Sequence, residues 1–125
     1  TVTGVERIAA ERKRQIEAEG WTAEHDAAHE TPEALAVAAG CYACPPWARE
    51  MHERPVWEWS GGARHPDTYL RPSGRTVTVP VLWPWDAEWW KPTPGNRIRE
   101  LEKAGALIAA EIDRLLGDKE EHGEA

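Results

Sequence analysis

The chain has 125 residues, of which 41% are hydrophobic and 30% charged, and its formal net charge is -7. This length suits one domain, and the composition is typical of a folded protein that dissolves in water. The negative charge argues against coating nucleic acid, because phosphate backbones are bound by clustered Lys and Arg. No apolar run approaches the roughly 20 residues of a membrane span, and no secretion signal is evident. We therefore expect a cytoplasmic protein without a membrane or nucleic-acid partner.

Charged and helix-forming residues gather at the two ends of the chain, and rigid aromatic residues lie between them. The middle, residues 45–95, holds seven of the eight Trp and nine of the ten Pro, and the chain has no Phe. We predict a single domain with four parts: a helical part (1–44), a Trp/Pro-rich insertion and arm (45–95), a C-terminal helix (96–116) and a flexible tail (117–125).

The first predicted helix runs from Thr3 to Glu19, with Gly20 as its C-terminal cap. Its apolar stripe is thin, and Arg12 falls on the same face as Ile8 and Ile16. An arginine in that position either extends along the apolar surface to solvent or points into a pocket.

A short helical turn is expected after Trp21, followed by a third helix that restarts at the "TPE" of residues 31–33. This helix, "EALAVAAGCYAC", is rich in small residues, so another helix can approach it closely. It ends at Cys44, because Pro45 and Pro46 cannot continue it.

The last segment predicts a helix over 96–116 that stops at Gly117, since its apolar residues recur at steps of three and four: Leu101, Ala104, Ile108, Ile112 and Leu115. In the middle, "VWEWS" and "RTVTVPVLW" alternate as strands do, although Pro80 limits the second run to an edge strand or an extended arm. The fold class that follows is mainly α, with three to four helices and an inserted β-hairpin or Trp/Pro-rich arm.

Two histidines are candidates for a metal site, because His25 and His29 stand one helical turn apart and Asp26 or Glu30 could complete the shell. The same residues can instead cap helix ends and form surface hydrogen bonds without a metal, and we favour this interpretation. A metal-dependent nucleotide hydrolase is the alternative, using Glu24, Asp26, Glu30 and Glu33. We find no ordered catalytic group and no glycine-rich phosphate loop, and so favour a protein that is not an enzyme and needs no cofactor.

The stretch "WPWDAEWWKP" places four indoles, from Trp83 to Trp90, in ten residues. Adjacent Trp89 and Trp90 must diverge, so all four cannot face one core, although any one of them could simply pack the helices. Lys91 and three arginines of the middle segment lie nearby in the sequence. Cationic groups beside flat aromatic faces are what a nucleotide requires, with charge for its phosphates and stacking for its base.

Several stretches, in this order along the chain, resemble one family: "ERKRQIEAEGWTAEHDAAH" (11–29), "LAVAAGCYA" (35–43), "WPWDAEWWKP" (83–92) and "LEKAGALIAAEIDRL" (101–115). The family comprises small proteins of phages and prophages, and it also forms the C-terminal part of larger phage early-region accessory proteins. It has no firm biochemical assignment. Residues 47–76 fall outside the resemblance, and Ala27 stands where the family commonly has a second Asp after Glu-His-Asp. Small accessory phage proteins often counter host defence, and the resemblance implies such a setting here.

These observations together predict a homo-oligomeric protein that sequesters a small nucleotide-derived immune signal without altering it. We expect its ligand contacts among aromatic, basic and polar residues: Arg12, Arg14, Trp21, His25, Asp26, His29, Trp83, Trp85, Trp89, Trp90, Lys91 and Arg97. Besides the hydrolase, a second alternative is an inhibitor module whose Trp patch docks on a host enzyme.

Overall fold

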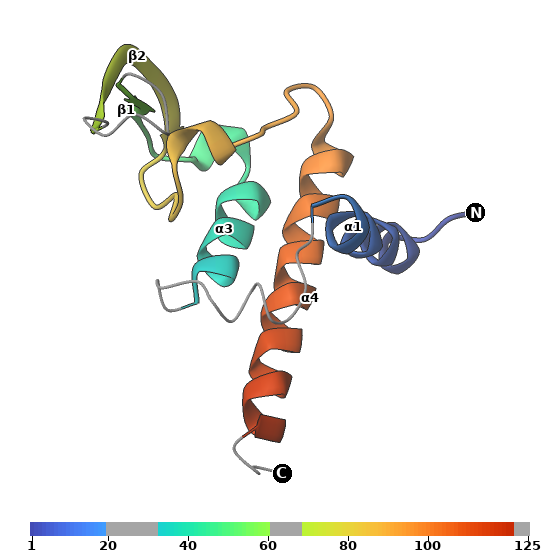
Figure 1. The fold of residues 1–125 in the computed structure, drawn as a ribbon. Coiled ribbons are helices and arrows are strands. Elements are labelled where there is room, and N and C mark those ends of the chain that lie inside the picture. The colour runs from blue at the N-terminus through green and yellow to red at the C-terminus, as the bar shows by residue number, and fades with distance from the viewer. Residues whose placement is uncertain (20–32, 61–68, 122–125) are drawn as a thin grey trace.

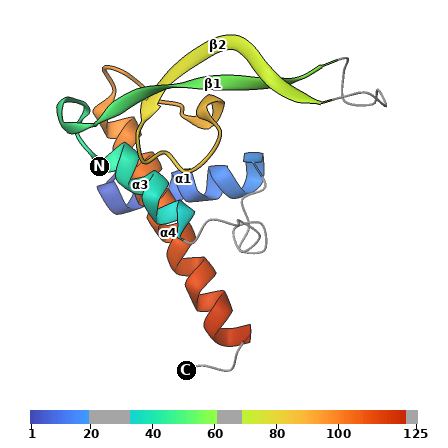
Figure 2. The ribbon, with the colours of Figure 1, turned by 90° about the vertical axis from the view of Figure 1, so that its left-hand side faces the viewer.

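The computed structural model describes residues 1–19, 33–60 and 69–121. Figure 1 shows the elements in chain order, with two short 3-10 turns between the longer ones: α1 (Gly4–Glu19), α3 (Ala34–Ala43), η1 (Pro46–Ala48), β1 (Met51–Trp59), β2 (Leu70–Pro80), η2 (Ala87–Trp89) and α4 (Arg97–Glu121). The two strands form one antiparallel sheet that extends above the helices (Figure 2).

The prediction of a mainly α class is wrong, because the part of the chain that the structure describes is mixed, with three helices and a two-stranded antiparallel sheet. The three helices and the hairpin themselves agree with the expectation. What the sequence pattern underestimated is the length of the strands. Strand β2 continues through Pro72 to Pro80, and β1 contains Pro55. In a two-stranded sheet each strand has a free edge, so a proline that lacks an N–H can be accommodated.

The helix boundaries differ from the predicted ones mainly at the C-terminal end. Helix α4 passes through Gly117 and ends at Glu121, so the expected stop at 116 is wrong. A glycine inside a helix costs only about 1 kcal/mol relative to alanine, which is not enough to end a helix by itself. Helix α3 begins after Glu33, whose backbone is left-handed with φ of 52°. The predicted cap Thr31 and the turn after Trp21 lie outside the described residues.

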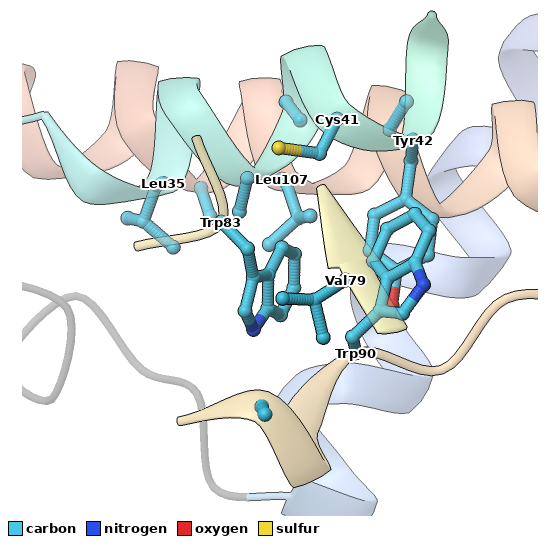
Figure 3. Packing of buried hydrophobic residues seen from close by; sticks show 12 residues of the cluster. Leu35, Cys41, Tyr42, Val79, Trp83, Trp90 and Leu107 are labelled. Carbon is cyan, nitrogen blue, oxygen red and sulfur yellow. The ribbon is translucent and has the colours of Figure 1, made fainter. Parts of the chain in front are cut away.

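The core forms where α3 packs against α4 and the Trp-rich segment closes over both (Figure 3). Small residues line the contact, with Ala38 of α3 and Ala104 and Ala110 of α4 all buried. Because alanine leaves little side chain between two backbones, the helices approach closely, as the composition of α3 predicted.

Most of the apolar residues by which the sequence identified α4 lie outside this core. Ala104 is buried, but the four larger members are between 44% and 52% exposed: Leu101, Ile108, Ile112 and Leu115. The buried face is the neighbouring one, with Glu100, Leu107 and Glu111 among its residues.

An ion-pair cluster ties the start of α4 to the end of α3. Buried Glu100 accepts hydrogen bonds from Arg49 at 3.0 Å and Arg97 at 3.2 Å. The same two guanidinium groups donate to the last carbonyl groups of α3, at Cys41, Tyr42 and Ala43. Burial raises the pKa of the Glu100 carboxyl, but the hydrogen bonds from Arg49 and the Thr93 N–H outweigh it and lower the pKa. The cluster thus caps a helix end that Pro45 would otherwise leave unsatisfied.

Within the part of the chain that the structure describes, no helix is both long and apolar enough to cross a membrane.

Candidate ligand-binding cavity

A cavity of about 780 Å³ lies between α1, α4, the end of α3 and the loop that follows the hairpin. Five of the side chains that line it are basic and two are acidic, and four aromatic residues complete most of the wall. The lining residues are Glu11, Arg14, Gln15, Tyr42, Arg54, Trp83, Pro84, Trp85, Asp86, Trp89, Lys91, Arg99, Lys103 and Leu107.

Arg54 of β1 holds the Trp-rich loop in place. Its guanidinium group donates to the carbonyl oxygens of Trp83 at 2.6 Å, Trp85 at 3.1 Å and Val81 at 3.2 Å. Its Nε also donates to His52 Nε2 at 2.9 Å, so all three nitrogen atoms of the guanidinium group donate hydrogen bonds. Such a planar group with five donors can replace the ladder hydrogen bonds that an irregular loop lacks. The strand therefore positions one aromatic wall of the cavity.

The four indoles of the loop occupy different environments. Trp83 is buried and meets Trp85 edge to face, with ring centroids 5.3 Å apart, and its Nε1–H donates to the Asp86 carbonyl. Trp90 is also buried, and its ring lies 4.6 Å from that of Tyr42 (Figure 3). Trp89 diverges from Trp90, as predicted, and is 57% exposed on the cavity wall. It is therefore the indole best placed to meet a ligand.

A buried carboxylate organises the opposite wall. Glu11 of α1 accepts hydrogen bonds from Arg14 at 2.7 and 2.9 Å, from Arg99 of α4 at 2.7 Å and from Gln15 at 3.1 Å. Burial alone would raise the pKa of Glu11, but the hydrogen bonds from Arg14 and Arg99 outweigh it and lower the pKa to about 2. Glu11 thus stays ionised and holds two guanidinium groups at the cavity.

Lys103 of α4 contributes a positive charge that is only partly compensated. Its ammonium group donates to the Lys91 carbonyl at 2.7 Å and lies 5.6 Å from the centre of the Tyr42 ring. No carboxylate in residues 1–19, 33–60 or 69–121 forms an ion pair with it. Burial, followed by the charge of Arg99, lowers its pKa. An incoming anion would oppose the repulsion from Arg99 and favour the charged ammonium form, since it supplies a nearby negative charge.

Five of the predicted ligand contacts lie on the cavity wall: Arg14, Trp83, Trp85, Trp89 and Lys91. Whether they touch a ligand stays a prediction. Three others lie elsewhere. Arg12 pairs with Asp113 at 3.3 Å, Arg97 is bound to the end of α3, and Trp90 belongs to the core.

Four further candidates fall outside the described residues: Trp21, His25, Asp26 and His29. The same holds for Glu24 and Glu30 of the alternative hydrolase site. Within the described residues, no group of three or more His, Cys, Asp or Glu side chains could hold a metal ion.

Apart from Arg14, the sequence did not predict the polar half of the wall, which consists of residues of α1 and α4 together with Tyr42 and Arg54. Glu11 and Gln15 stand four residues apart on α1, and Arg99 and Lys103 stand four apart on α4. Residues at this spacing share one helix face, so two polar faces were visible in the sequence. That they meet each other depends on how α1 crosses α4, which the sequence pattern does not reveal.

Comparisons with protein-family models, with curated proteins and with solved structures found no match. The resemblance to the phage and prophage family therefore stays a prediction from the sequence motifs.

Proposed function

We propose that the cavity binds a small, anionic, nucleotide-like ligand and that the protein sequesters this ligand without altering it. The observation that carries the proposal is the meeting of five basic side chains with Trp and Tyr rings around one cavity, in a protein whose net charge is -7. A cluster of positive charge in an acidic protein raises the local concentration of anions.

The positive charge on the cavity wall suits the binding of a phosphate group. Glu11 already balances much of the charge of Arg14 and Arg99, whereas Lys103 and Lys91 form no ion pair with the described residues. Lys103 therefore provides the strongest attraction for a phosphate, because its ammonium group is partly removed from water.

The aromatic side chains of the cavity wall suit the stacking of a flat ring such as a nucleotide base. Trp89 and Trp85 lie on the wall beside buried Trp83, whose edge-to-face contacts with its neighbours fix the orientation of the group. Stacking a base on an aromatic side chain is worth roughly 1–3 kcal/mol. The volume of about 780 Å³ lies within the range of small-molecule sites.

The resemblance to phage and prophage proteins extends the proposal to its setting. We infer that the ligand is a nucleotide-derived immune signal of an infected cell and that its removal counters host defence. The support for this step is the order of the sequence motifs, and it is separate from the support for the cavity.

The test is calorimetric titration of the purified protein with cyclic dinucleotides, ADP-ribose derivatives and mononucleotides. We expect at least one of them to bind at micromolar concentration or tighter. Trp89→Ala should weaken that binding about tenfold, in line with the loss of one stacking contact. The matched control is Trp47→Ala, because Trp47 is exposed and lies outside the cavity wall. It should leave the affinity unchanged.

Two results would overturn the proposal. One is the absence of binding across the whole panel. The other is the recovery of a chemically changed nucleotide after denaturation, since a sequestering protein returns its ligand intact.

A further inference from the structure

The exposed apolar residues of α4 follow a heptad repeat. If Ile98 is assigned to position a, then Gly105 and Ile112 also fall on a, and Leu101, Ile108 and Leu115 fall on d. Every one of these Ile and Leu side chains is between 44% and 60% exposed. Positions a and d form the seam by which helices of a coiled coil associate, and Ile at a with Leu at d favours two strands.

Helix α1 crosses this seam at one position, Gly105. The side chain of Ile8 fills the space over Gly105, where an added Cβ atom would lie 2.5 Å from Ile8 Cδ1. Below that crossing, α4 extends beyond both α1 and α3 (Figures 1 and 2). Among the described residues, the longest part of the seam that no other helix covers is therefore formed by Ile108, Ile112 and Leu115.

Among the side chains that the structure describes, the acidic residues beside the seam are compensated within their own chain. Glu102 pairs with Arg7 and Arg99, and Asp113 pairs with Arg12, whereas Glu111 is buried within its own chain. Two identical acidic chains would normally repel each other. Because these carboxylates are already paired, the same surface of a second copy meets little uncompensated negative charge.

The exposed area also fits a dimer. Below the α1 crossing, three Ile and Leu side chains that are about half exposed present on the order of 250 Å² of apolar surface. A stable dimer buries about 800 Å² on each partner, and the fully buried centre of such an interface is its most apolar part. The seam provides that centre, and the paired charges beside it provide a polar rim.

We propose that a second copy of this chain docks on α4, seam against seam, about a two-fold axis. Such a contact is isologous, since the same surface serves both partners. The ligand cavity lies on other faces of α4, lined by Arg99, Lys103 and Leu107, so dimer formation and ligand binding can be tested separately.

The test is sedimentation velocity of the full chain at micromolar concentration, without added ligand. The wild-type protein should sediment with twice the 14.0 kDa mass of the chain. Ile108→Glu and Ile112→Glu should each sediment as a monomer, because each places an unpaired carboxylate in the seam. Their circular dichroism should match the wild type, since both side chains are already half exposed.

The matched control is Leu82→Glu, which changes a more exposed leucine in the turn after β2 and should leave the dimer intact. A monomeric wild-type protein would overturn the proposal. So would a dimer that survives both seam substitutions, because the contact would then lie on another surface.

Discussion

Glu11 is a buried carboxylate whose ionised form the surrounding side chains stabilise. Its carboxylate is buried and bound by Arg14, Arg99 and Gln15, and its pKa is lowered to about 2 from an ordinary value of 4.5. A lowered pKa in the folded protein means that the ionised form stabilises the fold. This contribution is complete above pH 4.5 and is lost as the pH falls toward 2.

We therefore expect the free energy of unfolding to decrease between about pH 5 and pH 2, with roughly 3 kcal/mol of the decrease due to Glu11. Glu11→Gln should lose about that amount at neutral pH and should show a flatter acid dependence. Glu17→Gln is the control, since the Glu17 side chain is 65% exposed, and its effect should stay within about 0.5 kcal/mol. Urea unfolding across this pH range measures both. Equal acid dependence in wild type and Glu11→Gln would contradict the assignment.

Lys103 is the residue on which the affinity for an anion should depend most. Replacing it by Met keeps an unbranched side chain of similar length and removes the charge. We expect Lys103→Met to weaken ligand binding tenfold to about a hundredfold, as for a hydrogen bond to a charged group. Lys13→Met removes the same charge from an exposed position outside the cavity wall and should not change the affinity. Calorimetric titration distinguishes the two, and equal effects would mean that only net charge matters.

At the scale of elements, the crossing of α1 and α4 depends on a glycine. Gly105 leaves space for Ile8, and a Cβ atom there would lie 2.5 Å from Ile8 Cδ1 and 2.6 Å from Cγ1. We expect Gly105→Ala to destabilise the protein by about 1 kcal/mol, because the overlap costs more than the helix propensity of alanine returns.

The sign of this effect should reverse when Ile8 is shortened. In an Ile8→Ala background the space is open, so Gly105→Ala should stabilise the protein by up to about 1 kcal/mol. A double-mutant cycle measured by chemical unfolding tests the contact. Additive effects of the two substitutions would contradict it.

Features of the elements could be predicted where a short stretch of sequence determines them by itself. The small residues of α3 indicated a close helix contact, and the adjacent Trp89 and Trp90 indicated divergent indoles. Strand β2 begins at Leu70, before the predicted run, and ends at Pro80, the residue that was expected to interrupt it. The stop at Gly117 failed because the preference of glycine for helix ends is weak beside the favourable continuation of a long helix.

At the scale of the whole molecule, the sequence indicated half of the candidate site. The aromatic half was visible because its Trp residues lie in one stretch. The polar half, apart from Arg14, was not, since Glu11 and Arg99 are 88 residues apart and meet only where α1 crosses α4. The sequence pattern also did not indicate which face of α4 is buried. Its contact with α3 uses alanines, which a hydrophobic pattern weighs less than the Ile and Leu residues of the exposed seam.

The central claim, that the cavity holds an intact nucleotide-like ligand, is tested most directly by native mass spectrometry of the protein mixed with the nucleotide panel. We predict one ligand per chain, of unchanged mass, on the wild-type protein and none on a folded Lys103→Met/Trp89→Ala double variant. Equal occupancy of the wild type and the double variant, or no bound nucleotide on either, would contradict the account.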